Sequence, residues 1–304
     1  MKRGLLGKCK QGKLDCRVGK PIKILGISCA NRSEFDCAKE GPISFQLLKI
    51  ILDRAKKQGA ETELIELRKL KIQPCKECYS TCPAQCRFNE KNNMCDCYPR
   101  INPTIFLDNG NQLSLEEAYE KLEKKEFISR IKDQRSFDYG DDMTQVYKAM
   151  READGIIFSG FTNFYSRPAL MQLMFSRLCA LDGGVEELWG DGKNLNNSIK
   201  YSRDKTKKYK QRLYGKQVAF VNVSKEGDSV TPDLMKACTM MGMNIIPFST
   251  CYRVNWYSDP THRADMKNSL NDPYTLSLAK FIGKKIVDEV KRSNRSYGIY
   301  NGIV

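Results

Sequence analysis

The stretch that most constrains the fold runs from Ile22 to Leu48, where an apolar run, a polar loop and an amphipathic segment follow one another. The apolar run, Ile22 to Ile27, predicts a strand, and Phe45 to Lys57 predicts a helix with one apolar face. Glu61 to Leu67 then alternates polar and apolar residues, as a second strand does. Strand, helix and strand in so short a stretch indicate a βαβ unit with parallel strands and a right-handed crossover.

The rest of the chain repeats this alternation. Asp141 and Asp142 are expected to cap the helix that follows them, because carboxylates favour the positive end of a helix. Five strands alternating with helices predict an α/β fold with a flavodoxin-like, doubly wound, five-stranded parallel sheet. The further predicted strands are 154–159, 216–223 and 243–248, and the further helices are 143–153, one starting at Pro168, 231–241 and 272–292.

Two insertions interrupt this pattern, and we expect one domain with excursions. Residues 1–20 form a basic arm, 21–292 the flavodoxin-like domain, and 293–304 a loose C-terminal tail. The first insertion, 75–140, is rich in cysteine and then polar, with a helix expected at 115–127. The second, 183–214, is polar and then strongly basic.

Composition sets the class of protein. The chain has 304 residues, of which 41% are hydrophobic, and carries a formal net charge of +15. It has no apolar run long enough for a membrane span and no signal-peptide core, so we expect a cytoplasmic protein. The charge favours anionic partners such as nucleic acid, phosphate cofactors or acidic proteins, although solvated surface charge explains it equally simply. Nucleic acid is not favoured, because no basic stripe is interleaved with aromatic residues.

The loop after the first strand is rich in donors for an anion. It lies at the carboxyl end of a parallel strand and leads into a helix N-terminus, a place where phosphate binds. The dinucleotide-binding and nucleotide-triphosphatase spacings are absent, so a monophosphate held by side chains fits better. An ordinary polar loop is the alternative. The candidate ligands are Ser28, Asn31, Arg32, Ser33 and Ser44.

The loop after the third strand offers aromatic side chains with polar groups between them. Together with the polar loop 224–229 it suits a flat heteroaromatic ring, because the three loops share one edge of the sheet. Phosphate at one end and a ring at the other describe a mononucleotide, and flavin mononucleotide (FMN) is the natural candidate. Phe161 and Phe164 as core residues are the alternative. The candidate ring-binding residues are Phe161, Thr162, Asn163, Phe164, Tyr165, Ser166 and Arg167.

The pattern resembles the NADPH-dependent FMN reductase-like proteins of flavodoxin fold, and among them the iron-sulfur flavoproteins. The matching text is KILGISCANRS, AKKQGAETELIELRKLKIQPCKEC, DDMTQVYKAMREADGIIFSGFTNFYSRPALMQLMFSRL, GKQVAFVNV and MGMNIIPF, in family order. The resemblance implies bound FMN with its phosphate and ring at the residues named above, and a homodimer or homotetramer. The first loop is longer than the family's, and Gly160, Asn163 and Ser166 replace the family's usual residues in the second.

Six cysteines crowd into residues 75–97. Thiolates at such spacing bind soft metals and oxidise readily, and four of them can hold an iron-sulfur cluster or zinc. The resemblance favours a [4Fe-4S] cluster, because the iron-sulfur flavoproteins carry a four-cysteine motif at this place. Structural zinc, and free or disulfide-bonded cysteines, are the alternatives. Cys179 and Cys238, in helical stretches, are expected in the core. The candidate ligands are Cys75, Cys78, Cys82 and one of Cys86 or Cys95.

These features predict an FMN-dependent oxidoreductase that passes electrons from NAD(P)H or a reduced carrier through FMN to the cysteine-bound cluster and an acceptor. Backbone amides and Arg167 would stabilise the reduced flavin. One rival is a non-catalytic protein with structural zinc and a basic surface for nucleic acid or an acidic partner. A second rival is an electron carrier without nicotinamide activity.

Overall fold

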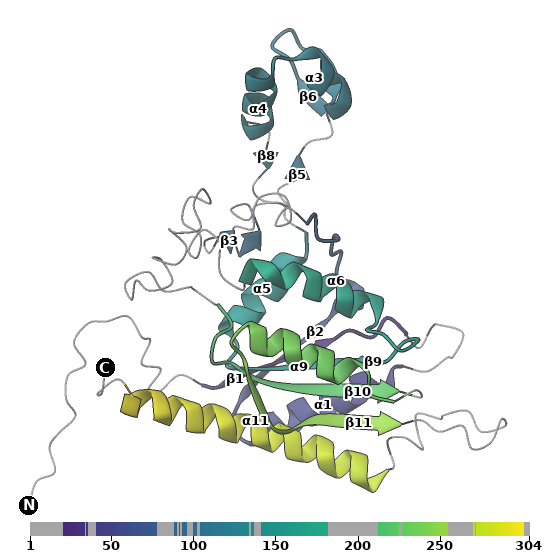
Figure 1. Cartoon of the computed structure of the whole chain (residues 1–304), viewed down its shortest axis with the longest axis vertical. Coiled ribbons are helices and arrows are strands. Elements are labelled where there is room, and N and C mark those ends of the chain that lie inside the picture. The colour runs from purple at the N-terminus through teal and green to yellow at the C-terminus, as the bar shows by residue number, and fades with distance from the viewer. Residues whose placement is uncertain are drawn as a thin grey trace, which may run out of the picture.

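The computed structural model describes residues 21–33, 35, 41–77, 88–89, 91, 93–95, 100–101, 104–133, 135–136, 141–181, 212–224, 227–254, 270 and 272–300. At its centre lies a five-stranded sheet, ordered β11-β10-β9-β1-β2, with every pair parallel (Figure 1). From the β2 edge, with the strands of this sheet numbered in chain order, the order is 2-1-3-4-5. This is the flavodoxin-like order, which confirms the predicted fold class. The strands are β1 (Lys23–Ser28), β2 (Glu61–Glu66), β9 (Gly155–Phe161), β10 (Gln217–Ser224) and β11 (Asn244–Val254).

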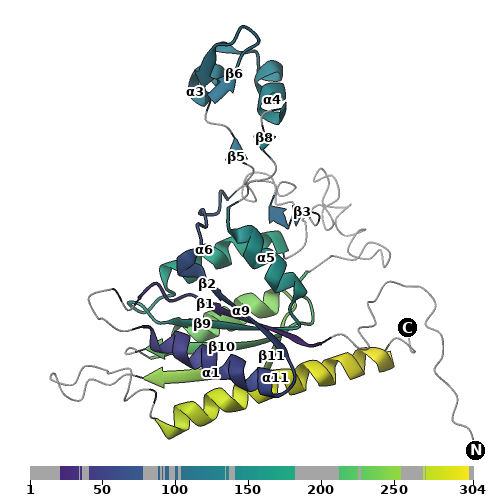
Figure 2. The same cartoon turned by 180° about the vertical axis from the view of Figure 1, so that it is seen from behind.

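Helices cover both faces of the sheet. Helices α1 and α11 lie on one face, and α5, α6 and α9 lie on the other (Figures 1 and 2). Alternate residues of β1 separate the two cores, since Ile24 packs with the α1 and α11 side chains while Leu25 and Ile27 pack toward α5 and α6. The helices are α1 (Ile43–Lys57), α5 (Met143–Glu152), α6 (Ala169–Arg177), α9 (Val230–Met240) and α11 (Pro273–Tyr300), with short 3-10 turns η1 (Leu67–Lys69) and η3 (Leu178–Leu181).

Strand β11 is longer than the sequence indicated. The prediction of irregular structure from Ser249 is wrong as far as Val254, because the strand bulges and then resumes its pairing with β10. Val218 pairs with Ile245, but Phe220 pairs with Thr250. The extra residues of the bulge break the apolar pattern from which a strand is recognised.

The last helix is also longer than predicted. Asp272 caps it, since its Oδ2 accepts a hydrogen bond from the Thr275 N–H at 3.1 Å. The helix then continues past Arg292 to Tyr300, so the part of the expected tail up to Tyr300 is helical. No proline interrupts this polar stretch, and polarity alone does not end a helix.

The segment between β2 and α5 forms short elements, of which β4 packs against α5 while β5, β6, β8, α3 and α4 stand apart from the sheet, at the top of Figure 1. The single helix expected over 115–127 is two helices, because Leu122 takes an extended conformation. A reciprocal capping box of Ser114 and Glu117 starts the first of them. None of the helices among the described residues is both long and apolar enough to cross a membrane. The elements are β3 (Phe88–Asn89), β4 (Met94–Cys95), β5 (Arg100–Ile101), β6 (Thr104–Phe106), β7 (Gln112–Ser114), α3 (Leu115–Lys121), α4 (Lys124–Asp133) and β8 (Arg135–Ser136).

Candidate functional site

The candidate site lies at the carboxyl ends of β1, β9 and β10. β1 and β9 are neighbours, but the connection after β1 leads to β2 on one side and the connection after β9 leads to β10 on the other. Ligands of open α/β sheets bind at such a switch point. The order of the strands therefore brings together the two loops in which the sequence placed the phosphate and ring ligands.

The loop after β1 folds back onto the start of α1. The Cys29 N–H donates to the Ser159 carbonyl at 2.7 Å, which continues the sheet past the end of β1. Farther along, Arg32 Nη2 donates to the Gly41 carbonyl at 3.0 Å. Ser28 is buried, whereas Asn31 is exposed. Arg32 thus connects the described start of the loop to Gly41, and the polar residues of that start lie at different depths.

The N-terminus of α1 is buried but carries no side-chain cap, and Ser44, a predicted phosphate ligand, is 2% exposed. Its N-cap is Pro42, which makes no side-chain cap, and its first turn has no acidic residue. The N–H groups of Ile43 and Ser44 find no acceptor among the described residues. The Ser159 hydroxyl donates to the Ser44 carbonyl at 2.8 Å and fastens this turn to β9. Free N–H groups and the helix dipole both favour negative charge here.

The loop after β9 is a tight turn that presents two aromatic side chains. Asn163 and Ser166 exchange backbone hydrogen bonds of 2.9 and 3.0 Å. Between them Phe164 and Tyr165 both have positive φ, 46° and 60°, as in a type I′ turn, a conformation that costs energy for residues other than glycine. Phe164 is 84% exposed and Tyr165 is 65% exposed. The core interpretation is therefore wrong for Phe164, while Phe161 does pack against the α1 and α11 core.

Arg167 is already engaged within the protein. Its guanidinium pairs with Asp233 of α9 and lies over the Phe175 ring, 5.1 Å from the centroid. Its side chain is mostly buried. The carboxylate of Asp233 balances its charge, so its contribution to a reduced flavin would be smaller than the sequence suggested.

The sequence analysis missed a polar network between the β9 and β10 loops. Asn222 and Thr162 are both buried, and the Asn222 amide lies between the Thr162 hydroxyl and the Asp228 carboxylate. Asn222 lies within an otherwise apolar stretch that predicts only a buried strand. An asparagine inside such a run was the available signal, because buried amides need partners.

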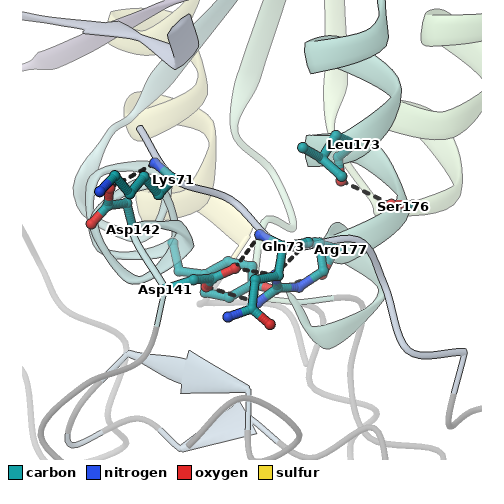
Figure 3. Close-up of polar contacts among 8 residues, drawn as sticks. Lys71, Gln73, Asp141, Asp142, Leu173, Ser176 and Arg177 are labelled. Carbon is teal, nitrogen blue, oxygen red and sulfur yellow. Dashed lines mark hydrogen bonds and ion pairs between the residues drawn. The ribbon is translucent and has the colours of Figure 1, made fainter. Parts of the chain in front are cut away.

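The base of the cysteine-rich segment is fastened by a buried ion pair (Figure 3). Arg177 Nη1 lies 2.5 Å from Asp141 Oδ2, and these side chains are 1% and 3% exposed. Arg177 also donates to the Gln73 carbonyl at 2.9 Å, and Asp141 accepts from the Gln73 N–H at 2.7 Å. Asp142 accepts from the Lys71 N–H at 2.7 Å. Asp142 is the N-cap residue of α5, as predicted, but its side chain makes no cap hydrogen bond. Both carboxylates accept from backbone N–H groups of residues 71–73 instead.

The described cysteines of this segment lie close to that ion pair. Cys75 is half-buried two positions beyond Gln73, and Cys95 is buried in β4 beneath α5. The Tyr147 hydroxyl donates to the Arg177 carbonyl at 2.7 Å. Burial raises the pKa of Tyr147, Arg177 lowers it, and the nearby thiols of Cys95 and Cys179 raise it further.

The predicted metal site falls largely outside the described residues. Cys78, Cys82 and Cys86 lie outside them, and within the described ranges no group of three metal-binding side chains gathers. The ligand set of Cys75, Cys78, Cys82 and Cys86 or Cys95 therefore stays a prediction.

The remaining described cysteines divide by exposure. Cys238 is buried, as expected, and burial raises its pKa to about 12, against a smaller opposing effect of Arg167. Cys29 is fully buried, and this burial raises its pKa as well. The expectation that Cys179 is a core residue is wrong: it is exposed, because η3 follows α6 directly and turns it outward, where its thiol donates to the Ser176 carbonyl at 3.5 Å.

Comparison with known proteins supports the fold. No protein-family model and no curated protein matches the chain. Among solved structures, RosB with bound 8-demethyl-8-formylriboflavin-5'-phosphate is similar at a TM-score of 0.53 and 13% identity, over 89% of this chain and 79% of that one. A flavone reductase gives a TM-score of 0.46 at 17% identity, over 89% of this chain and 63% of its own. An archaeal flavodoxin gives 0.40 at 9% identity, over 89% and 99%. At such identities the likeness to RosB establishes the flavodoxin-like fold alone.

Proposed function

We propose that this protein binds FMN at the β1/β9 switch point and is an FMN-dependent oxidoreductase. The observation that carries the proposal is the pairing, at one edge of the sheet, of an uncapped helix N-terminus with a strained turn that exposes two aromatic rings. The first suits a phosphate and the second a planar ring. The fold shared with RosB, which holds a riboflavin phosphate derivative, supports the same ligand class.

Each group of residues has a distinct role in this proposal. The N–H groups of Ile43 and Ser44 and the hydroxyl of Ser33 bind the phosphate, while Arg32 holds the loop closed through Gly41. Phe164 and Tyr165 lie against the ring. Backbone N–H groups of the β9 turn meet its polar edge, where they stabilise the negative charge that reduction adds. FMN, when bound, supplies the hydride and electron chemistry.

We further propose that NAD(P)H or a reduced carrier protein donates the electrons, and that a cysteine-bound [4Fe-4S] cluster receives them. The buried Arg177 and Asp141 pair supports this, because it fixes the segment from which Cys75 extends close to the sheet. Zinc at the same cysteines would instead give a structural site. A single flavodoxin-like domain over 21–292, acting as a homodimer or homotetramer, completes the proposal.

The test is flavin binding followed by turnover. We expect purified protein to quench FMN fluorescence saturably, and Arg32→Ala to weaken FMN more than riboflavin, because riboflavin lacks the phosphate. Anaerobic oxidation of NADPH or NADH by the FMN-loaded protein then distinguishes a reductase from a carrier. Iron and zinc analysis of anaerobically purified protein distinguishes the two metal alternatives. Protein that binds neither flavin would overturn the proposal.

A further inference from the structure

Strand β10 buries the polar side chain of Asn222 between two apolar residues, Val221 and Val223. Asn222 is 2% exposed, and every residue of β10 is buried. It lies beside Gly160 of β9 and Tyr252 of β11, on an interior strand of the sheet and near the carboxyl end of that strand. Burying an amide there is unfavourable unless its hydrogen bonds are made.

The Asn222 amide bridges two loops. Its Nδ2 donates to the Thr162 hydroxyl at 3.1 Å and to Asp228 Oδ1 at 2.6 Å. The same oxygen of Asp228 accepts from the Thr231 N–H at 2.9 Å in the first turn of α9. One side chain thus connects the residue that precedes the aromatic turn to the N-terminus of α9.

Two further contacts join the same turn to the same helix end. The Ser229 hydroxyl donates to the carbonyl of Tyr165, one of the two residues with positive φ, at 3.0 Å. Arg167, just after the turn, pairs with Asp233. A strained turn persists only where its surroundings hold it, and these contacts supply that restraint.

We propose that Asn222 is a positioning residue for the ring end of the flavin site: through Thr162 and Asp228 it holds the aromatic turn of residues 163–166 in its left-handed conformation. The part of this inference that concerns flavin rests on the proposed function, whereas the part that concerns the conformation of the turn does not. Flavin then finds Phe164 and Tyr165 already placed. If the competent turn fell to about a tenth of the population, the apparent Kd for flavin would rise about tenfold.

The variant Asn222→Val removes the bridge and keeps a strand-favouring side chain. The matched control is Asn244→Val, at the exposed start of β11, remote from the turn along the strands. We expect Asn222→Val to weaken FMN and riboflavin by the same factor, about tenfold, because the phosphate end is unaffected. The control should bind both flavins as the unmodified protein does.

A flavin-free readout separates this inference from the proposed function. Chymotrypsin cleaves after exposed aromatic residues in mobile turns, so Asn222→Val should be cut after Phe164 or Tyr165 several times faster than the control. Asn222→Asp keeps the size of the side chain but replaces the donor by a second carboxylate beside Asp228, so it should be cut as fast as Asn222→Val.

The outcomes are distinct. Unchanged cleavage in Asn222→Val overturns the inference whatever happens to flavin binding, and so does faster cleavage with unchanged flavin affinity. If the unmodified protein binds no flavin, the proposed function fails, and the cleavage rates alone decide whether Asn222 holds the turn. Cleavage of Asn222→Asp as slow as that of the control would also overturn the bridging role.

Discussion

Removing the charge of Asp141 should destabilise the protein severely. Asp141→Asn keeps the shape of the side chain and an oxygen for the Gln73 N–H, but it leaves the Arg177 guanidinium, 1% exposed, without its counter-charge. Breaking a buried ion pair from one side costs about 3 to 5 kcal/mol, because the remaining charge is uncompensated. At about 2 to 4 °C per kcal/mol for a domain of this size, the melting midpoint should fall by roughly 6 to 20 °C.

The assays are urea unfolding, for the free energy, and thermal unfolding, for the melting midpoint, both followed by circular dichroism with Asp142→Asn as the matched control. Asp142 accepts a backbone hydrogen bond from Lys71 at 2.7 Å but forms no ion pair among the described residues, so its loss should cost only about 1 kcal/mol. Replacing both partners, Asp141→Leu with Arg177→Met, should recover much of the stability lost. If Asp141→Asn is no less stable than Asp142→Asn, the ion pair does not fasten the cysteine-rich segment as argued.

Three other predictions follow from packing, strain and burial. Gly283→Ala should cost about 1 to 3 kcal/mol in thermal unfolding, because the added Cβ would lie 2.4 Å from the Ile51 carbonyl oxygen, between α1 and α11. Gly41→Ala, the control, should be nearly neutral. Equal stabilities of the two variants would contradict that packing. The double variant Phe164→Asn with Tyr165→Gly should stabilise the apoprotein by about 1 kcal/mol, because Asn and Gly suit a type I′ turn. The same variant should bind FMN more weakly. A double variant less stable than the unmodified protein would argue against strain in the turn. In native protein at about pH 8, iodoacetamide should alkylate the exposed Cys179 well before Cys238 and Cys251. Only the thiolate reacts, and burial raises the pKa of Cys238 and of Cys251 to about 12. Peptide mapping that finds Cys238 labelled first would refute this order.

The fold could be predicted from the sequence because its strands are buried on both faces. Runs such as Ile156 to Phe158 and Val218 to Val221 are apolar throughout. Continuous apolar runs are typical of parallel strands that helices cover on both faces. The bulge in β11 could not be predicted, because the predicted strand ends at Phe248, before the polar Ser249 and Thr250, yet pairing with β10 resumes at Thr250. Local pattern does not reveal pairing that resumes after an interruption.

The site could be predicted in its position but only partly in its contacts. Parallel strands bring their carboxyl ends together, so the loops after β1 and β9 had to meet. The partners of Asp141 and Arg167 lie far away in the sequence, at Arg177 and Asp233, and no local motif indicates them. The exposure of Phe164 also depends on its positive φ, which aromatic residues rarely adopt and sequence patterns therefore do not suggest.

The central claim is that FMN binds at the β1/β9 switch point, and a fluorescence titration of the purified chain with FMN and with riboflavin tests it most directly. The account predicts saturable binding of about one FMN per chain and at least about tenfold weaker binding of riboflavin, because only FMN brings a phosphate to the free N–H groups of α1. No saturable binding of FMN up to about 1 mM, or equal affinity for the two flavins, would contradict it.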